Sequence, residues 1–203
     1  MNKNIEDYIF LKENFLGEDF CDYSIDILSK ASWIKPWLRY PIKPEEQQAD
    51  IPLSDIPKES ELLDFNNLNN MFLQREIKSI TSEMMQSIPE VLMEYCSSFK
   101  FNWLGGWTGY SEIKFNRYSL GQGMMAHWDN VSHSFPETTG VSFLTIIGFL
   151  NNDYEGGDLI LCEDKKIDAK KGNVLIFPSS FIYPHQVTPL TKGFRYSYVC
   201  WVY

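Results

Sequence analysis

Apolar residues recur with helical spacing in two segments of the N-terminal half. In residues 19–32 they fit one face of a short helix with an acidic start: Phe20, Tyr23, Ile27 and Leu28. A second set, with steps of four, three, four and four residues, predicts a longer helix: Leu73, Ile77, Ile80, Met84 and Ile88. We expect this helix to pack against a sheet, and Pro89 to kink or restart it.

Between these helices, residues 35–57 contain five prolines and few periodic apolar positions. This composition predicts an irregular loop that either packs on a neighbouring surface or acts as a lid.

Beyond Phe101 the pattern changes to short β-rich runs separated by Gly, Asn, Asp and Pro. These runs are "EIKFNRYS", "VSFLTIIGFL", "DLILC", "NVLIF" and "RYSYVCWVY". Strands after helices predict an α+β, mainly β fold. A length of 203 residues suits a single domain, residues 1–203, in which residues 1–100 form helical support and loops and residues 101–203 form most of the core.

Charge and composition exclude several classes of protein. The formal net charge of −9 has the wrong sign for a domain that binds nucleic acid through phosphates. The cysteines, Cys21, Cys96, Cys162 and Cys200, form no CxxC pair, so we expect buried thiols in a reducing compartment. No run approaches about 18 consecutive apolar residues, and the first residues do not resemble an export signal. We therefore expect a soluble, cytoplasmic protein without a membrane partner.

The candidate chemistry begins with "MMAHWDNVSHSF", residues 124–135. In an extended backbone, His127 and Asp129 project from the same face and could bind one metal ion. The third ligand would be His185, after the strand-like "NVLIF". Two imidazoles and one carboxylate that leave positions open are typical of non-haem Fe(II) oxygenases. Because HxD pairs also occur by chance, the spacing alone leaves a structural role open.

Arg195 adds a second feature to this pattern. It begins a strand in which Arg195, Ser197 and Val199 share one face. A guanidinium with a hydroxyl two residues on suits a carboxylate, such as the distal group of an iron-chelating 2-oxo acid. Lys192 is a rival, but it precedes Gly193 in a predicted turn and we interpret it as solvated.

At this point the sequence resembles the 2-oxoglutarate and Fe(II)-dependent dioxygenases, within them the prolyl 4-hydroxylase-like group. The matching stretches are "RYSLGQGMMAHWD", "FLNNDYEGGDLIL" and "GNVLIFPSSFIYPHQVTPLTKGFRYS", so the resemblance covers residues 113–203. "YIFLKENFLGEDFCDYSIDIL" is similar to the family's opening strand and helix. The resemblance implies a double-stranded β-helix, or jelly roll, with a metal between two sheets. Gly156 and Gly157 would form a tight turn.

The resemblance also implies roles for individual residues. His127, Asp129 and His185 match the metal ligands, and Arg195 matches the residue that pairs with the distal carboxylate of 2-oxoglutarate. For the same co-substrate pocket the candidates are Tyr118, Thr145 and Ser197, and a core role is the alternative for Tyr118 and Thr145. We interpret His133 as a loop histidine near the pocket, with substrate contact as the other option.

The implied activity is hydroxylation of an unactivated C–H bond, most simply in a prolyl residue of a peptide or protein. The implied cofactors are Fe(II), 2-oxoglutarate as co-substrate and O2, with ascorbate as an optional addition. The products would be succinate and CO2. Three alternatives stay open: a free amino acid or small metabolite as substrate, an AlkB-like nucleic-acid demethylase, and a non-catalytic binding module. Trp201 stands where AlkB-like proteins have a second arginine, which disfavours the demethylase. The substrate and the oligomeric state are not determined by the sequence.

Overall fold

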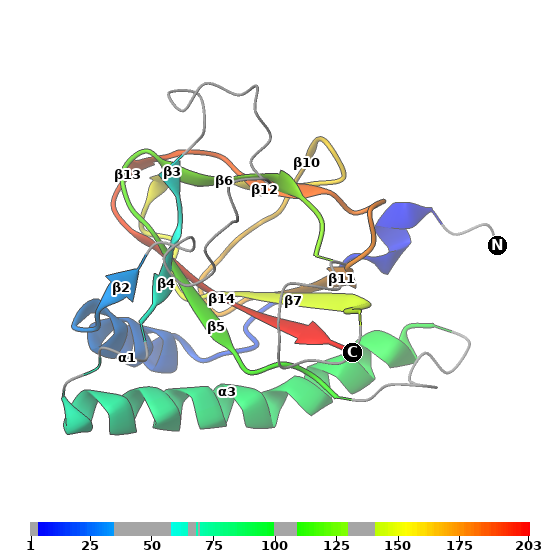
Figure 1. Cartoon of the computed structure of the whole chain (residues 1–203). Helices are drawn as coiled ribbons and strands as arrows, with labels where there is room; N and C mark the ends of the chain where they lie inside the picture. Colours follow the sequence, from blue (N-terminus) through cyan, green and yellow to red (C-terminus); the bar gives the residue numbers. More distant parts are fainter. Residues whose placement is uncertain (1–3, 35–57, 65–67, 69, 100–108, 130–140) are drawn as a thin grey trace.

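The computed structural model describes residues 4–34, 58–64, 68, 70–99, 109–129 and 141–203. The predicted lid at 35–57 and His133 lie outside these residues. In the described chain, two sheets face each other and two helices lie along the outer side of the larger sheet (Figure 1). This is the mainly β, α+β architecture that the sequence predicts.

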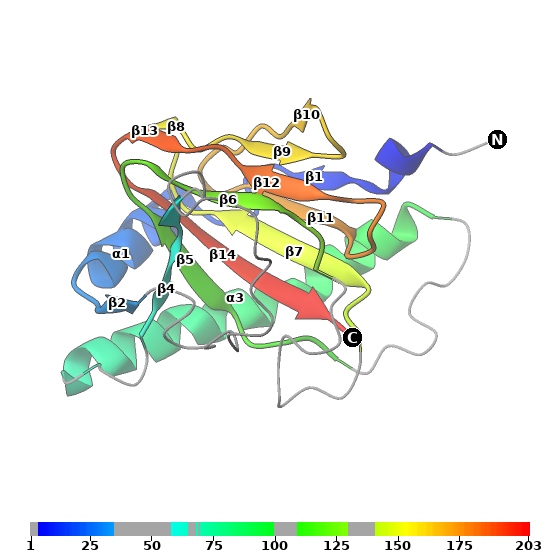
Figure 2. The same ribbon diagram turned by 45° about the horizontal axis from the view of Figure 1, so that its top comes forward.

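The larger sheet has the order β1 (Phe10–Lys12), β11 (Val174–Pro178), β7 (Leu144–Phe149), β14 (Arg195–Val202), β5 (Lys114–Tyr118), β4 (Glu61–Leu63) and β2 (Trp33–Ile34). The smaller sheet has the order β10 (Lys165–Lys166), β9 (Leu159–Leu161), β12 (His185–Val187), β6 (Gln122–His127) and β3 (Lys58–Glu59). β13 (Leu190–Lys192) pairs with β8 (Glu155–Gly156). Figure 2 shows the smaller sheet stacked over β7, β14 and β5. The order in each sheet mixes strands distant in sequence, as a jelly roll requires.

Both predicted helices are present. α1 spans Glu18–Ser29 and α3 spans Met71–Ser97, and a short 3-10 helix, η1 (Ile5–Tyr8), precedes β1. The Asn70 side chain caps α3 by accepting a hydrogen bond of 2.9 Å from the Phe72 amide. All five residues of the predicted stripe are buried, and α3 continues through Pro89 without a restart. The stripe therefore faces the sheet, as expected.

Alternation along β14 divides the interior into two cores. Tyr196, Tyr198, Cys200 and Val202 belong to the core beneath the helices. The alternate residues, beginning with Arg195 and Ser197, face the smaller sheet and line the space between the sheets. Gly148 on β7 makes this packing possible, because a Cβ there would lie 2.0 Å from the Tyr198 ring.

The predicted strand runs correspond to β5, β7, β9, β11 and β14, and the opening strand and helix correspond to β1 and α1. Residues before 100 also contribute β2, β3 and β4, which the sequence analysis assigned to loops and helical support. The single-domain assignment stays a prediction. Gly156 and Gly157 have φ values of 71° and 64°, as expected for a tight turn.

All four cysteines are free, as predicted, but only two are buried. Burial raises the pKa of Cys21 to about 11 and that of Cys200 to about 12. Cys96 and Cys162 are partly exposed, so the expectation of four buried thiols is wrong for these two. Among the described residues, no helix is both long and apolar enough to cross a bilayer.

Candidate active site

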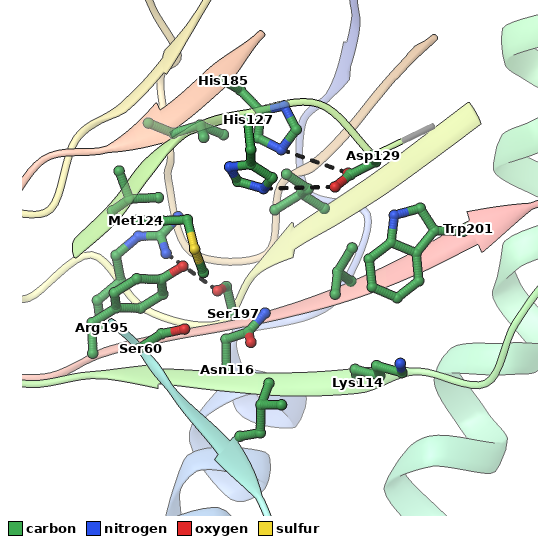
Figure 3. Close-up of a pocket in the computed structure, with 16 residues that line it drawn as sticks. Ser60, Lys114, Asn116, Met124, His127, Asp129, His185, Arg195, Ser197 and Trp201 are labelled. Carbon is green, nitrogen blue, oxygen red and sulfur yellow. Dashed lines mark hydrogen bonds and ion pairs between the residues drawn. The ribbon is translucent and has the colours of Figure 1, made fainter. Parts of the chain in front are cut away.

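A cavity of about 370 Å³ lies between the sheets and contains most of the predicted site residues. Its walls come from β5, β6, β7, β9, β12 and β14, and from the segment around Ser60. Figure 3 shows His127, Asp129 and His185 on one side, Arg195, Ser60 and Ser197 at one end, and Lys114 and Trp201 at the other. The two motifs found in the sequence therefore meet in one cavity.

The pairing of β6 with β12 brings the three predicted metal ligands together. His127 and His185 are direct partners in the sheet, with ring centroids 4.3 Å apart. Each Nε2 lies 3.6 Å from a different carboxylate oxygen of Asp129. One ligand atom from each residue falls within 4.8 Å of the others. Ligands at right angles around one ion lie about 3 Å apart, so small side-chain rotations would fit these three donors to a divalent metal.

Backbone carbonyls hold both imidazoles in the orientation that metal binding requires. His127 Nδ1 lies 2.7 Å from the Met125 carbonyl, and His185 Nδ1 lies 3.3 Å from the Tyr183 carbonyl. Because a carbonyl oxygen only accepts, each Nδ1 carries the proton and each Nε2 presents its lone pair to the cavity. Burial lowers the pKa of His185 to about 4, with a smaller contribution from His127 and an opposing one from Asp129. The His185 imidazole is therefore neutral at neutral pH, the form that binds metal.

Three hydroxyl groups hold Asp129 in place, and one of them bonds its carboxylate directly. Thr145 Oγ1 donates to Asp129 Oδ2 over 2.8 Å, and it lies 2.8 Å from Ser179 Oγ. Ser142 Oγ donates to the Asp129 carbonyl, also over 2.8 Å. Thr145, Ser179 and Ser142 are all buried. Thr145 thus lies behind the metal ligands and does not line the cavity near Arg195, where the sequence analysis expected it. Its predicted contact with the co-substrate has no support in this geometry.

We expect Thr145→Val to weaken metal binding by about tenfold, the lower end of the range for residues that orient a metal ligand. Valine keeps the β-branched shape but cannot donate to Asp129. Isothermal titration with Mn(II) tests this, with the exposed Thr191→Val as the matched control. Equal affinity in Thr145→Val and wild type would show that the hydrogen bond does not position the carboxylate.

Arg195 is a buried cation at one end of the cavity, away from the metal ligands. The residue is 1% exposed, and its side chain donates to Ser197 Oγ over 3.2 Å. Its Nε has no hydrogen-bond partner, and no carboxylate pairs with it among the described residues. A buried guanidinium without an anion is costly. The cavity therefore fits a ligand that brings a carboxylate to this end.

Tyr118 and Ser197 also lie where the sequence analysis expected them. The Arg195 guanidinium carbon lies 4.8 Å from the centre of the Tyr118 ring. Burial raises the pKa of Tyr118, with the nearby charge of Arg195 acting in the opposite direction. The phenol is thus protonated and could donate to a carboxylate.

The rival carboxylate binder Lys192 lies elsewhere. Its side chain is 73% exposed and pairs with Glu155 over 2.7 Å on the β13–β8 pair. This agrees with its interpretation as solvated.

Several cavity residues were missed by the sequence analysis. Lys114 and Asn116 alternate with Tyr118 on β5, and Trp201 continues the alternation from Arg195 on β14. Alternate residues of a strand face the same side. Once Tyr118 and Arg195 were candidates, this alternation could have identified the other three. Ser60 has no such signal, because it is distant in sequence and belongs to no motif.

Comparison with known proteins connects this geometry to a family. Residues 113–203 match the model of the 2OG-Fe(II) oxygenase superfamily. Over these residues, somewhat less than half of the chain, the sequence is similar to that superfamily. The oxygenase region is 35% identical to a PKHD-type hydroxylase of Psychrobacter sp. over 95 residues and 36% identical to one of Alteromonas mediterranea over 95 residues. Each match covers 43% of this chain, but only 36% and 41% of the relatives, so the chain spans about two fifths of their length.

Solved structures show the same fold over nearly the whole chain. A prolyl hydroxylase from Trichoplax adhaerens, in complex with a hypoxia-inducible-factor peptide fragment, has a TM-score of 0.62 and 20% identity, covering 97% of this chain and 84% of its own. A Pseudomonas putida prolyl-4-hydroxylase has a TM-score of 0.57 and 15% identity, covering 96% and 91%. These likenesses confirm the predicted jelly roll. The cofactors of the superfamily are Fe(II) and 2-oxoglutarate, and the cavity has donor groups suited to both.

Proposed function

We propose that this chain is a 2-oxoglutarate- and Fe(II)-dependent hydroxylase whose substrate is a prolyl residue in a peptide or protein. The observation that carries the proposal is the placement of three convergent metal-ligand side chains in one cavity with a buried arginine that has no anion among the described residues. The three ligand side chains account for metal binding. The buried arginine accounts for a dicarboxylate that binds the metal with its other end. The overall reaction would convert a C–H bond, 2-oxoglutarate and O2 into an alcohol, succinate and CO2.

In this proposal His127, Asp129 and His185 hold Fe(II), which supplies O2 activation when bound. Arg195 binds the distal carboxylate of 2-oxoglutarate and so fixes its orientation, while Tyr118 and Ser197 complete that end of the cavity. The network behind Asp129 keeps the carboxylate in place during turnover. Apolar side chains around the cavity limit the access of water to the reacting bond.

Two features support a prolyl substrate within a longer chain. The end of the cavity away from Arg195 has Val199 and Trp201 as apolar walls, which suit an aliphatic ring. Lys114 lies at the same end, with its ammonium nitrogen 5.2 Å from the centre of the Trp201 ring. Large exposed apolar side chains also flank the metal ligands in sequence: Trp128 at 50%, Ile182 at 45% and Phe181 at 71% exposure. Because β6 and β12 pair at His127 and His185, the segments that carry them meet beside the cavity. Such a surface is more useful for binding a peptide than a single amino acid.

A turnover screen tests this function. We expect the Fe(II)-loaded protein to convert 2-oxoglutarate to succinate faster with prolyl peptides than with free amino acids, and the peptide to gain one oxygen atom by mass spectrometry. His185→Ala serves as the inactive control. Stimulation by free amino acids alone would favour the small-metabolite alternative. No iron-dependent succinate formation under any condition, including cell extract as a substrate source, would favour a non-catalytic binding module.

A further inference from the structure

Ser60 lies at the point where the chain crosses from one sheet to the other. β3 before it pairs with β6 in the smaller sheet, and β4 after it pairs with β5 in the larger sheet. Figures 1 and 2 show this short crossing between the layers at the end of the molecule where α1 lies. Ser60 therefore closes the cavity at the end that contains Arg195, and it comes from a segment that the family match does not include.

The side chain of Ser60 is held in this position by its neighbours. Residues 60 and 62 both line the cavity, whereas Glu61 points to the other face, as strand alternation requires. There Glu61 accepts a hydrogen bond of 2.9 Å from Arg117 Nε, and the Arg117 guanidinium lies 4.9 Å from the Trp33 ring centre. This cluster attaches β4 to β5, so the orientation of Ser60 follows from contacts outside the cavity.

The hydroxyl of Ser60 is buried close to the phenol of Tyr118. The residue is 0% exposed, and its Oγ makes no hydrogen bond of ordinary length among the described residues, although it is near enough to Tyr118 to lower the pKa of that phenol. Arg195 Nε is unpartnered in the same way, and Figure 3 shows Ser60 beside Arg195 at this end of the cavity. Buried polar groups are normally satisfied, so two unpartnered donors at one end indicate a missing acceptor.

We propose that Ser60 is a further binding residue for 2-oxoglutarate, donating a hydrogen bond to the same distal carboxylate that Arg195 binds. A carboxylate has two oxygens and about four acceptor directions, enough for Arg195, Tyr118 and Ser60 together. A neutral acceptor would satisfy Ser60 but leave the charge of Arg195 uncompensated. This inference rests on the proposed function and adds a contact from the N-terminal half to it.

Calorimetric titration of the Mn(II)-loaded protein with 2-oxoglutarate tests the inference. We expect Ser60→Ala to weaken 2-oxoglutarate binding about tenfold, about 1.4 kcal/mol, without changing Mn(II) affinity. The same titration is repeated with 2-oxopentanoate, which has a methyl group in place of the distal carboxylate. The affinity for this analogue should differ less than about twofold between wild type and Ser60→Ala. Ser24→Ala, an equally buried serine in α1, controls for general destabilisation.

The outcomes separate this inference from the proposed function. If wild type fails to bind 2-oxoglutarate, the proposed function is wrong and the role of Ser60 falls with it. If wild type binds 2-oxoglutarate and Ser60→Ala binds it equally well, only the role of Ser60 is wrong. Equal losses for 2-oxoglutarate and 2-oxopentanoate would also overturn it, because the effect would then not depend on the distal carboxylate.

Discussion

Arg195→Ala is expected to weaken 2-oxoglutarate binding by about 2 to 5 kcal/mol while leaving metal binding intact. In wild type the guanidinium is almost completely buried and has no anion among the described residues. In the variant the distal carboxylate would enter a desolvated pocket without a counter-charge. Titration of the Mn(II)-loaded proteins measures the loss directly. Arg195→Lys should recover only part of it, because an ammonium supplies charge without the planar fork.

Lys192→Ala is the matched control, since it removes a cation that is close in sequence but exposed and paired with Glu155. Its affinity for 2-oxoglutarate should equal that of wild type. A collapse in Lys192→Ala with no change in Arg195→Ala would move the anchor to the lysine. No change in either variant would exclude 2-oxoglutarate as the ligand of this cavity.

Arg195→Met separates the binding role from a structural one. Methionine fills part of the space of arginine but removes a buried charge that has no counter-ion, so thermal stability without ligand should be equal or higher. The rise in melting temperature that 2-oxoglutarate gives to the wild type should disappear in this variant. Marked destabilisation of ligand-free Arg195→Met would indicate that the arginine mainly supports the fold.

The sequence predicts features that depend on neighbouring residues better than features that depend on residues far apart in the chain. The helical stripe of α3 and the β-rich runs follow from local periodicity, and the structure contains them. The sequence analysis did not predict β6 and β12 as strands. Gly123 interrupts the β-rich composition of β6, and β12 spans only three residues. Their pairing nevertheless creates the cluster of His127 and His185. That long-range register was available only through the family resemblance.

The site shows the same limit. Strand alternation correctly places Arg195 and Ser197 on one face, but it does not show which side of Asp129 a residue on β7 will reach. Thr145 was therefore assigned to the co-substrate end, whereas it lies behind Asp129. Ser60 illustrates the stronger failure, because every candidate site residue named from the sequence lies at position 118 or beyond. A crossing between two sheets is a property of tertiary structure and leaves no periodic signal in the sequence.

The second large effect concerns the metal. His127→Ala and His185→Ala should each reduce Mn(II) affinity by more than about 100-fold, since even residues that only orient a ligand change affinity by about 10- to 100-fold. Each variant removes one of three donors that lie within 4.8 Å of one another, and no other such group of His, Cys, Asp and Glu occurs among the described residues. His133→Ala is the informative control, because it removes the third histidine of the chain, which the sequence analysis did not assign as a ligand. Its Mn(II) affinity should match wild type in calorimetry and in the electron paramagnetic resonance signal of free Mn(II). If His127→Ala kept full affinity while His133→Ala lost it, the metal would bind elsewhere, and the assignment of His127 and Asp129 as a ligand pair would be wrong.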